Sequence, residues 1–296
     1  MLSVESVHLG LGGRAVLAGC SLDVAPGEVV AVIGPNGAGK SSLMSLLSGA
    51  RRPDRGRVAI DSRQIESLNG RALARARAVL EQAPDLAFPF RCLDLVLLGR
   101  DPHIGRSTPA RDLAIAEAAM AETDCLAFAD RLYPTLSGGE RQRVQLARAL
   151  AQIWPEPEGA RAHARDGGRF LLLDEPSNNL DLAHQQALMT TIRRMADAGI
   201  GVLAILHDPN LAALGADRLC ALKDGRIVAD GPTERVLTSD LVGEVFGVHA
   251  TILRHPRTGR PCILPDGPES CRMAADEITV LSPSHGKRRK QPCSSL

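Results

Sequence analysis

Aromatic side chains are scarce in this chain, because Phe, Trp and Tyr make up only 2% of its 296 residues. Aliphatic side chains must therefore fill the core, and the apolar share of 44% is ordinary for a soluble globular protein. The length allows one large domain, or one domain with a subdomain.

Other features are missing as well. The seven cysteines include no C-x-x-C pair, which excludes the usual zinc spacing and favours a reducing compartment over a dense disulfide framework. No apolar run approaches the ~18 residues of a membrane-spanning helix. The polar residues Glu5 and His8 interrupt the start of the chain, so we expect no secretory signal. The formal net charge of +1 gives no argument for a nucleic-acid partner.

A glycine-rich segment, residues 34–41, is the most informative stretch that is present. It follows the apolar run 29–33, a predicted buried strand, and precedes a predicted helix. Its glycines let backbone N–H groups approach phosphates, Lys40 supplies charge to the β/γ oxygens, and Ser41 supplies a hydroxyl for Mg²⁺. A glycine-rich turn without a ligand is the alternative, but the full pattern in this context favours a nucleotide triphosphate site. The predicted nucleotide-binding residues here are Gly34, Pro35, Asn36, Gly37, Ala38, Gly39, Lys40, Ser41 and Ser42.

The rest of the chain predicts an α/β core with an inserted helical part. Short strands are expected up to residue 33, and helical patterns between about 86 and 165 predict an α-helical subdomain. We expect one domain over residues 1–265. Residues 266–296 are polar and predicted to be a disordered tail. Its basic run, 287–290, could contact anionic lipid or nucleic acid, but such short runs are more often only solvated.

Three further sets of polar residues accompany the glycine-rich segment. Ser137 and Glu140 form a predicted capping box at a helix start, and the intervening Gly138 and Gly139 leave backbone N–H groups exposed to an anion. A helix cap with no other role is the alternative for this set.

The other two sets follow apolar strands. Asp174 ends one strand and could hold Mg²⁺ through water, while Glu175 beside it could polarise an attacking water. His207 ends the next strand, at the edge where parallel sheets bind ligands. A structural histidine is the alternative at that position.

In this order the motifs resemble those of the ATP-binding cassette (ABC) ATPases, over roughly residues 2–265. The resemblance implies a P-loop NTPase core with an antiparallel β layer, and ATP and Mg²⁺ as cofactors. It implies that Gln82 is the glutamine that senses the γ-phosphate and Mg²⁺, and that Asp174 is the acidic Mg²⁺ residue. Glu175 would be the general base, and His207 would contact the γ-phosphate.

The same resemblance covers the segments through which two nucleotide-binding subunits meet. Residues 136–139 are similar to the family's signature, so Ser137, Gly138 and Gly139 would bind the nucleotide held by a second copy. Residues 178–181, Asn-Asn-Leu-Asp, occupy the D-loop, where many members carry Ser-Ala-Leu-Asp, and Asp181 is a further predicted binding residue. The chain departs from the family at Leu11, where an aromatic residue usually stacks on adenine, and at Ser42, where Thr is common.

Several strings resemble the group that drives uptake of iron compounds and cobalamin, among them residues 82–84, 88–90 and 98–103. Residues 145–152 and 181–185 are most similar to the ATP-binding subunits of haemin importers. The resemblance implies a head-to-tail pair of this chain and two transmembrane permease subunits. It also implies, indirectly, a periplasmic haem-binding protein and a peripheral place on the cytoplasmic face of the inner membrane.

Alternatives stay open for the transported substrate and for the class of protein. The chain could serve a ferric-siderophore or cobalamin importer. A soluble ABC ATPase of translation or DNA repair is disfavoured, because the chain has one motif set and no heptad run. His103 and His184 could in principle bind haem, but we expect both to be surface histidines.

Overall fold

The computed structural model describes residues 1–81, 88–154, 167–178 and 180–267. Contacts divide the chain into a unit Met1–Pro265 and a unit Asp266–Leu296, and the description below concerns the first. In the described residues no helix is long and apolar enough to cross a membrane. The five cysteines among them are free thiols.

The N-terminal part builds an antiparallel sheet of four strands. Their order is β2 (Arg14–Val24), β1 (Leu2–Leu11), β4 (Arg55–Ile60) and β5 (Arg63–Gln64). Gly12 and Gly13, both of which have positive φ, make the turn between β1 and β2. This sheet is the predicted antiparallel β layer.

The second sheet has six strands and carries the parallel core. Its order is β10 (Arg226–Pro232), β9 (Arg218–Lys223), β3 (Val29–Ile33), β8 (Gly201–Ile205), β7 (Phe170–Asp174) and β6 (Arg77–Leu80). All neighbours pair in parallel except β10 with β9. Alternate residues of β3 enter two apolar clusters: Ala31 lies in the cluster with the helices, and Val30 in the one with β1, β2 and α1 (Lys40–Leu47). Both faces of the sheet are therefore buried.

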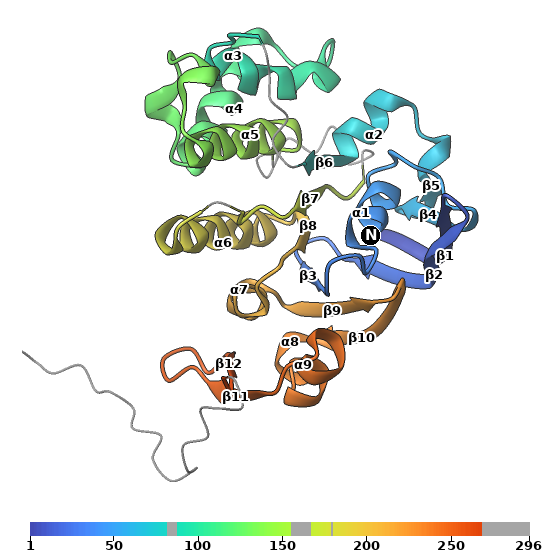
Figure 1. Cartoon of the computed structure of the whole chain (residues 1–296). Coiled ribbons are helices and arrows are strands. Elements are labelled where there is room, and N and C mark those ends of the chain that lie inside the picture. The colour runs from blue at the N-terminus through green and yellow to red at the C-terminus, as the bar shows by residue number, and fades with distance from the viewer. Residues whose placement is uncertain (82–87, 155–166, 179, 268–296) are drawn as a thin grey trace, which may run out of the picture. The chain divides into compact units, whose positions relative to one another are not determined.

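Helices α3, α4 and α5 lie together, apart from the antiparallel sheet, between β6 and β7 in the chain (Figure 1). The remaining elements are the other helices and a C-terminal hairpin. The bounds are α2 (Gly70–Ala76), α3 (Cys92–Leu97), α4 (Pro109–Glu122), α5 (Gly138–Gln152), α6 (Leu182–Asp197), α7 (Pro209–Gly215), α8 (Thr233–Val236), α9 (Ser239–Phe246), β11 (Ala250–Arg254) and β12 (Pro261–Pro265).

The 3₁₀ turn Leu98–His103 fastens α3 and α4 to α5. A Cβ atom on Gly99 would lie 2.4 Å from the Arg148 carbonyl oxygen, so only glycine permits this approach. Arg100 is 4% exposed; its Nε donates to Asp112 at 2.9 Å and its Nη1 to a carbonyl of α5 at 2.6 Å. The expectation of a surface His103 is wrong, because the ring is half-buried and hydrogen-bonded to the α5 backbone, and burial lowers its pKa.

Two short helices, α2 and α7, have no counterpart in the prediction, because seven residues are too few for a clear helical period. Each begins at a side-chain cap that satisfies backbone N–H groups: Asn69 accepts from Ala72, and Asp208 from Asn210, both at 2.8 Å.

Candidate functional site

Three neighbouring strands deliver the predicted phosphate and catalytic residues to one edge of the six-stranded sheet. The strand β3 leads into the glycine-rich loop, β8 is followed by His207, and β7 ends at Asp174. Because Ile205 of β8 pairs with both Val32 and Asp174, the three strands end level with one another. Residues distant in sequence thus meet at the carboxyl edge of a parallel sheet, where such sheets bind ligands.

The phosphate loop, residues 34–41, is held in shape by neighbouring backbone. Gly34 has φ 154°, and a Cβ there would lie 2.1 Å from the Leu222 carbonyl oxygen of β9. Gly39 has φ 105°, and a Cβ there would lie 2.9 Å from a carbonyl oxygen of β2. From the β9–β10 turn, the Gly225 N–H donates to the Ala38 carbonyl at 3.0 Å. The loop is therefore fixed from both sides, and Gly34 and Gly39 are sterically required.

Lys40 opens α1 and is 6% exposed. Its Nζ donates to the Gly34 and Pro35 carbonyls at 2.8 and 3.0 Å, so the ammonium lies within the loop. Burial lowers the pKa of Lys40, and the charges of Glu175 and Asp174 oppose that shift. The cation and the two carboxylates therefore share one electrostatic environment.

Asp174 has the features of a ligand for a hydrated cation. Burial first, and then the charge of Glu175, raises the pKa of its carboxyl group. Its buried Oδ1 has no hydrogen-bond partner among the described residues. Among these residues no group of three or more His, Cys, Asp or Glu could enclose a metal. Mg²⁺ needs no such enclosure, because it usually keeps several waters and takes one or two protein ligands plus substrate phosphates.

Glu175 turns back across the sheet edge toward His207. Its φ of 52° is unusual for a non-glycine residue and is stabilised by its N–H, which donates to the Ile205 carbonyl at 3.2 Å. Its Oε1 lies 2.5 Å from Nε2 of His207. The Asn178 amide donates to Oε2 at 2.7 Å, a contact that sequence reasoning did not identify.

The capping box at the start of α5 is confirmed. The Ser137 N–H donates to the Glu140 carboxylate at 2.7 Å, and the Ser137 hydroxyl accepts from the Glu140 N–H at 3.4 Å. Hydrogen bonding from Ser137 to the Glu140 carboxylate lowers the pKa of Glu140. Ser137 and the glycines that follow it lie at an exposed helix N-terminus, where backbone N–H groups favour an anion.

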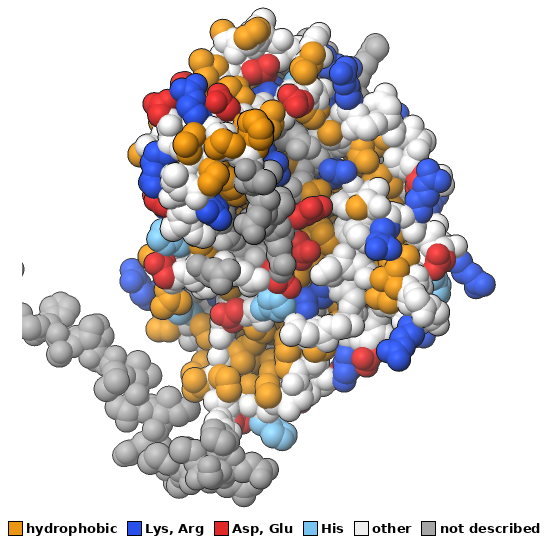
Figure 2. All heavy atoms as spheres, turned by 45° about the horizontal axis from the view of Figure 1, so that its top comes forward, with side chains coloured by type: hydrophobic (Ala, Val, Ile, Leu, Met, Phe, Trp, Pro, Cys, Tyr) orange, Lys and Arg blue, Asp and Glu red, His pale blue; other side chains and the backbone are white. Residues whose placement is uncertain are grey.

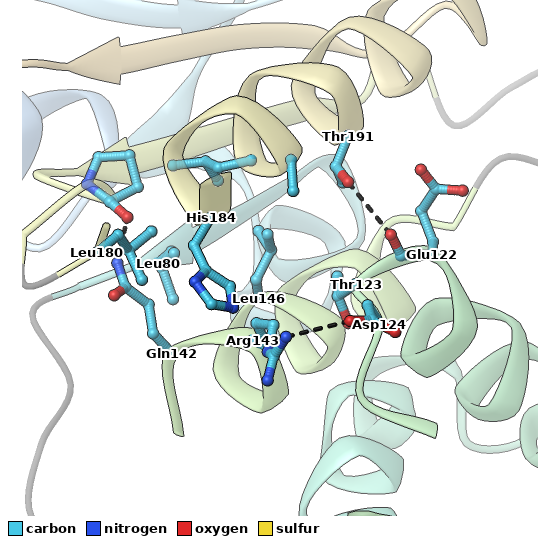
Figure 3. A pocket seen from close by; sticks show the side chains of 13 residues that line it. Leu80, Glu122, Thr123, Asp124, Gln142, Arg143, Leu146, Leu180, His184 and Thr191 are labelled. Carbon is cyan, nitrogen blue, oxygen red and sulfur yellow. Dashed lines mark hydrogen bonds and ion pairs between the residues drawn. The ribbon is translucent and has the colours of Figure 1, made fainter. Parts of the chain in front are cut away.

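A cleft lies between α5, the end of α4 and α6 (Figure 3). Its cavity volume is about 90 Å³, and it is partly open to solvent. His184 projects into it, and its Nδ1 lies 2.7 Å from Oδ1 of Asp181, which also caps α6. The Gln142 amide donates to the carbonyl of Pro176, next to Glu175, and so connects α5 to the turn that follows β7.

Comparisons with known proteins decide the family. A family model described as "ABC transporter" matches residues 17–154. The hemin import ATP-binding protein of Gloeobacter violaceus is 45% identical over 287 residues, covering 97% of this chain and 100% of that relative. This chain belongs to the ABC transporter family. The protein of the same description from Pseudomonas aeruginosa is 44% identical over 265 residues, covering 89% of this ABC protein and 99% of the relative.

Solved structures agree with the fold of this ABC protein. A metal-chelate type ABC transporter in an inward-facing conformation superposes with a TM-score of 0.72 at 26% identity, covering 89% of this chain and 96% of that one. A dimeric bacterial ABC transporter cassette superposes with a TM-score of 0.65 at 25% identity, covering 79% and 99%. The predicted fold class is confirmed, and the chain is an ATP-binding, ATP-hydrolysing protein of this family.

Some predicted features of the ABC protein cannot be placed. Gln82 and Asn179 lie outside the described residues. Beyond Gln82, Phe88 is 68% exposed, and its ring centroid lies 5.2 Å from that of Phe90. Leu11, which replaces the usual aromatic residue, is 37% exposed at the end of β1.

Proposed function

We propose that this chain is the ATP-hydrolysing subunit of an importer that takes up haem across the inner membrane. The observation that supports haem as the substrate is the match to relatives described as hemin import ATP-binding proteins, at about 45% identity and over most of the chain. The segment Leu98–His103, which resembles the iron and cobalamin uptake group, is also built into the fold through buried contacts of Gly99 and Arg100.

In this proposal two copies bind head to tail and enclose two ATP molecules. Each nucleotide would contact the phosphate loop of one copy, residues Gly34 to Ser42, and Ser137 to Gly139 of the other, with Asp181 at the shared boundary. The N-terminus of α5 supports this arrangement, because Ser137 and Gly138 are exposed and a second copy could reach them. The dimeric cassette with the same fold supports it as well.

Hydrolysis would take place at the sheet edge. Glu175 would accept a proton from the attacking water, and His207, 2.5 Å from that carboxylate, would contact the γ-phosphate. The Lys40 ammonium would stabilise charge on the β/γ oxygens. Ser41, Asp174 and the predicted Gln82 would hold Mg²⁺, which would neutralise phosphate charge when bound. The buried Oδ1 of Asp174, which has no hydrogen-bond partner among the described residues, fits that role.

The proposed partners are a second copy, two transmembrane permease subunits and, indirectly, a periplasmic haem-binding protein. The chain would lie peripherally on the cytoplasmic face of the membrane, with the exposed Phe88 near the permease. Lys and Arg side chains are dispersed over the face in Figure 2, which disfavours nucleic acid as a partner. A siderophore or cobalamin importer is the alternative within transport.

Purification from detergent-solubilised membranes tests the class of protein. A tagged chain should co-purify with a membrane permease, whereas recovery of ribosomes or DNA ends would contradict import. Uptake assays then test the substrate: cells with Lys40→Ala should lose haem uptake and retain siderophore and cobalamin uptake. Loss of one of the latter instead would reassign the substrate without affecting the ATPase assignment.

A further inference from the structure

Each oxygen of the Glu175 carboxylate has a partner: His207, which follows β8, and Asn178, in the same turn as Glu175. Oε1 lies 2.5 Å from Nε2 of His207, and Oε2 accepts a hydrogen bond from Nδ2 of Asn178 at 2.7 Å. The Asn178 backbone N–H also donates to the Glu175 carbonyl at 3.2 Å. The turn that leaves β7 therefore closes on itself through two hydrogen bonds between the same two residues.

This turn has little freedom to move. Glu175 has a left-handed backbone, which persists only where the surroundings hold it. The Pro176 carbonyl accepts from Gln142 of α5, which fixes the turn from the helical side. The Glu175 side chain is only 14% exposed. A carboxylate in this position can still rotate about its last torsion, and a donor on each oxygen fixes its plane.

The amide of Asn178 is suited to such a constraint. A side-chain amide donates at every physiological pH, while the ring of His207 donates or accepts according to its tautomer and protonation. Asn178 lies in the D-loop, at a position where the resemblance leads one to expect Ser. Its longer side chain spans the turn and reaches Oε2 of Glu175.

We propose that Asn178 is a positioning residue for ATP hydrolysis, whose amide holds Oε2 of Glu175 so that Oε1 is directed to the reacting water beside His207. This inference rests on the proposed role of Glu175 as general base. In this proposal the D-loop, through Asn178, supports the general base Glu175 of the same chain. Proton transfer is sensitive to such alignment, since displacements of about 1 Å can cost on the order of 10²-fold in rate.

Three substitutions separate the hydrogen bond from the shape of the turn. Asn178→Asp keeps the shape and replaces the donor by an acceptor, Asn178→Ala removes the group, and Asn178→Ser retains a shorter donor. We expect kcat to fall about tenfold in the Asp and Ala variants and less in the Ser variant, with KM for ATP within about twofold of wild type. Asn69→Asp is the matched control, because Asp caps α2 as well as Asn does.

A rise in KM with unchanged kcat, or Ser no better than Ala, would overturn the proposal. The deciding measurement repeats Asn178→Ala in a Glu175→Gln background. If Asn178 acts through the carboxylate, the second substitution should change the residual turnover by less than about twofold. A full tenfold loss in that background would assign Asn178 a separate structural role and leave the general base intact. Wild-type turnover in Glu175→Gln alone would instead overturn the base itself.

Discussion

The two halves of the proposed ATP site lie at the edge of the six-stranded sheet and at the start of α5, and they differ in how their residues are held in place. At the sheet edge, strands with fully buried residues such as Val32 set the positions of Asp174 and His207 through backbone register. At α5, Ser137 lies at an exposed helix start, and its described polar contacts are with its own first turn. One half is assembled inside the chain, and the other lies at the surface, where the proposed second copy would bind.

The largest expected effect comes from separating these halves in heterodimers that carry Lys40→Ala and Ser137→Arg, assembled with the permease. With both substitutions in one chain, each shared site loses one half, so ATP hydrolysis should vanish. With one substitution in each chain, one site loses both halves and the other stays whole, so trapping or hydrolysis of ATP should remain measurable.

Only the order of the two activities is needed. Greater activity of the heterodimer with both substitutions in one chain would show that each ATP site is built within a single chain. That result would discard the head-to-tail pair and, with it, the contrast between the two regions.

Glu175→Gln tests the sheet edge alone. The amide cannot accept the proton from water, so turnover should fall by on the order of 10²-fold or more, while ATP still binds. The variant should also dimerise with ATP, because one negative charge near the phosphates is removed. Steady-state hydrolysis together with size-exclusion chromatography in ATP measures both, and turnover within a few-fold of wild type would contradict the role of Glu175.

The helical side can be weakened without touching the site. Asp112→Ala removes the carboxylate that pairs with the buried Arg100, and the uncompensated cation should cost about 3 kcal/mol of unfolding free energy. Asp94→Ala, which breaks the exposed pair with Arg91, should change the unfolding free energy far less. Denaturant titration compares the two, and equal losses would show that burial of Arg100 does not govern the stability of this part.

The smallest expected effect concerns the base of the nucleotide. Leu11 offers apolar contact but no π-stacking, a loss of roughly 1 kcal/mol relative to an aromatic residue. We expect poor discrimination between ATP and GTP, and a modest gain in ATP affinity from Leu11→Tyr. Titration of both nucleotides measures this. A strong preference of the wild-type protein for ATP would show that another residue recognises the adenine base.

The sequence predicted those parts of the fold whose signal is local. Each of these elements has a pattern that is visible within a short stretch of sequence. Examples are the apolar runs of β3, β7 and β8 and the spacing of apolar residues in α4. Glycine spacing likewise predicts the phosphate loop. The order of the strands was not predictable in this way, because it depends on pairing between segments more than a hundred residues apart.

Side-chain contacts of the site show the same limit. The capping box of Ser137 follows from a three-residue spacing and was predicted, whereas the contacts of Asn178 with Glu175 and of Gln142 with Pro176 were not. The latter depend on the left-handed backbone of Glu175 and on how α5 packs, which no local pattern specifies. His103 was misassigned for a related reason, because its burial is set by α5.

The clamp of the β9–β10 turn on the phosphate loop has a consequence for biosynthesis. The N–H of Gly225 supports Ala38, and the Leu222 carbonyl lies against Gly34, so the loop depends on residues made almost two hundred positions later. A nascent chain that ends before Gly225 carries the complete phosphate-loop sequence without the backbone that shapes it. Nucleotide affinity should therefore arise late, as β9 joins the sheet, and nested truncations measured for ATP binding would mark that step on the ribosome.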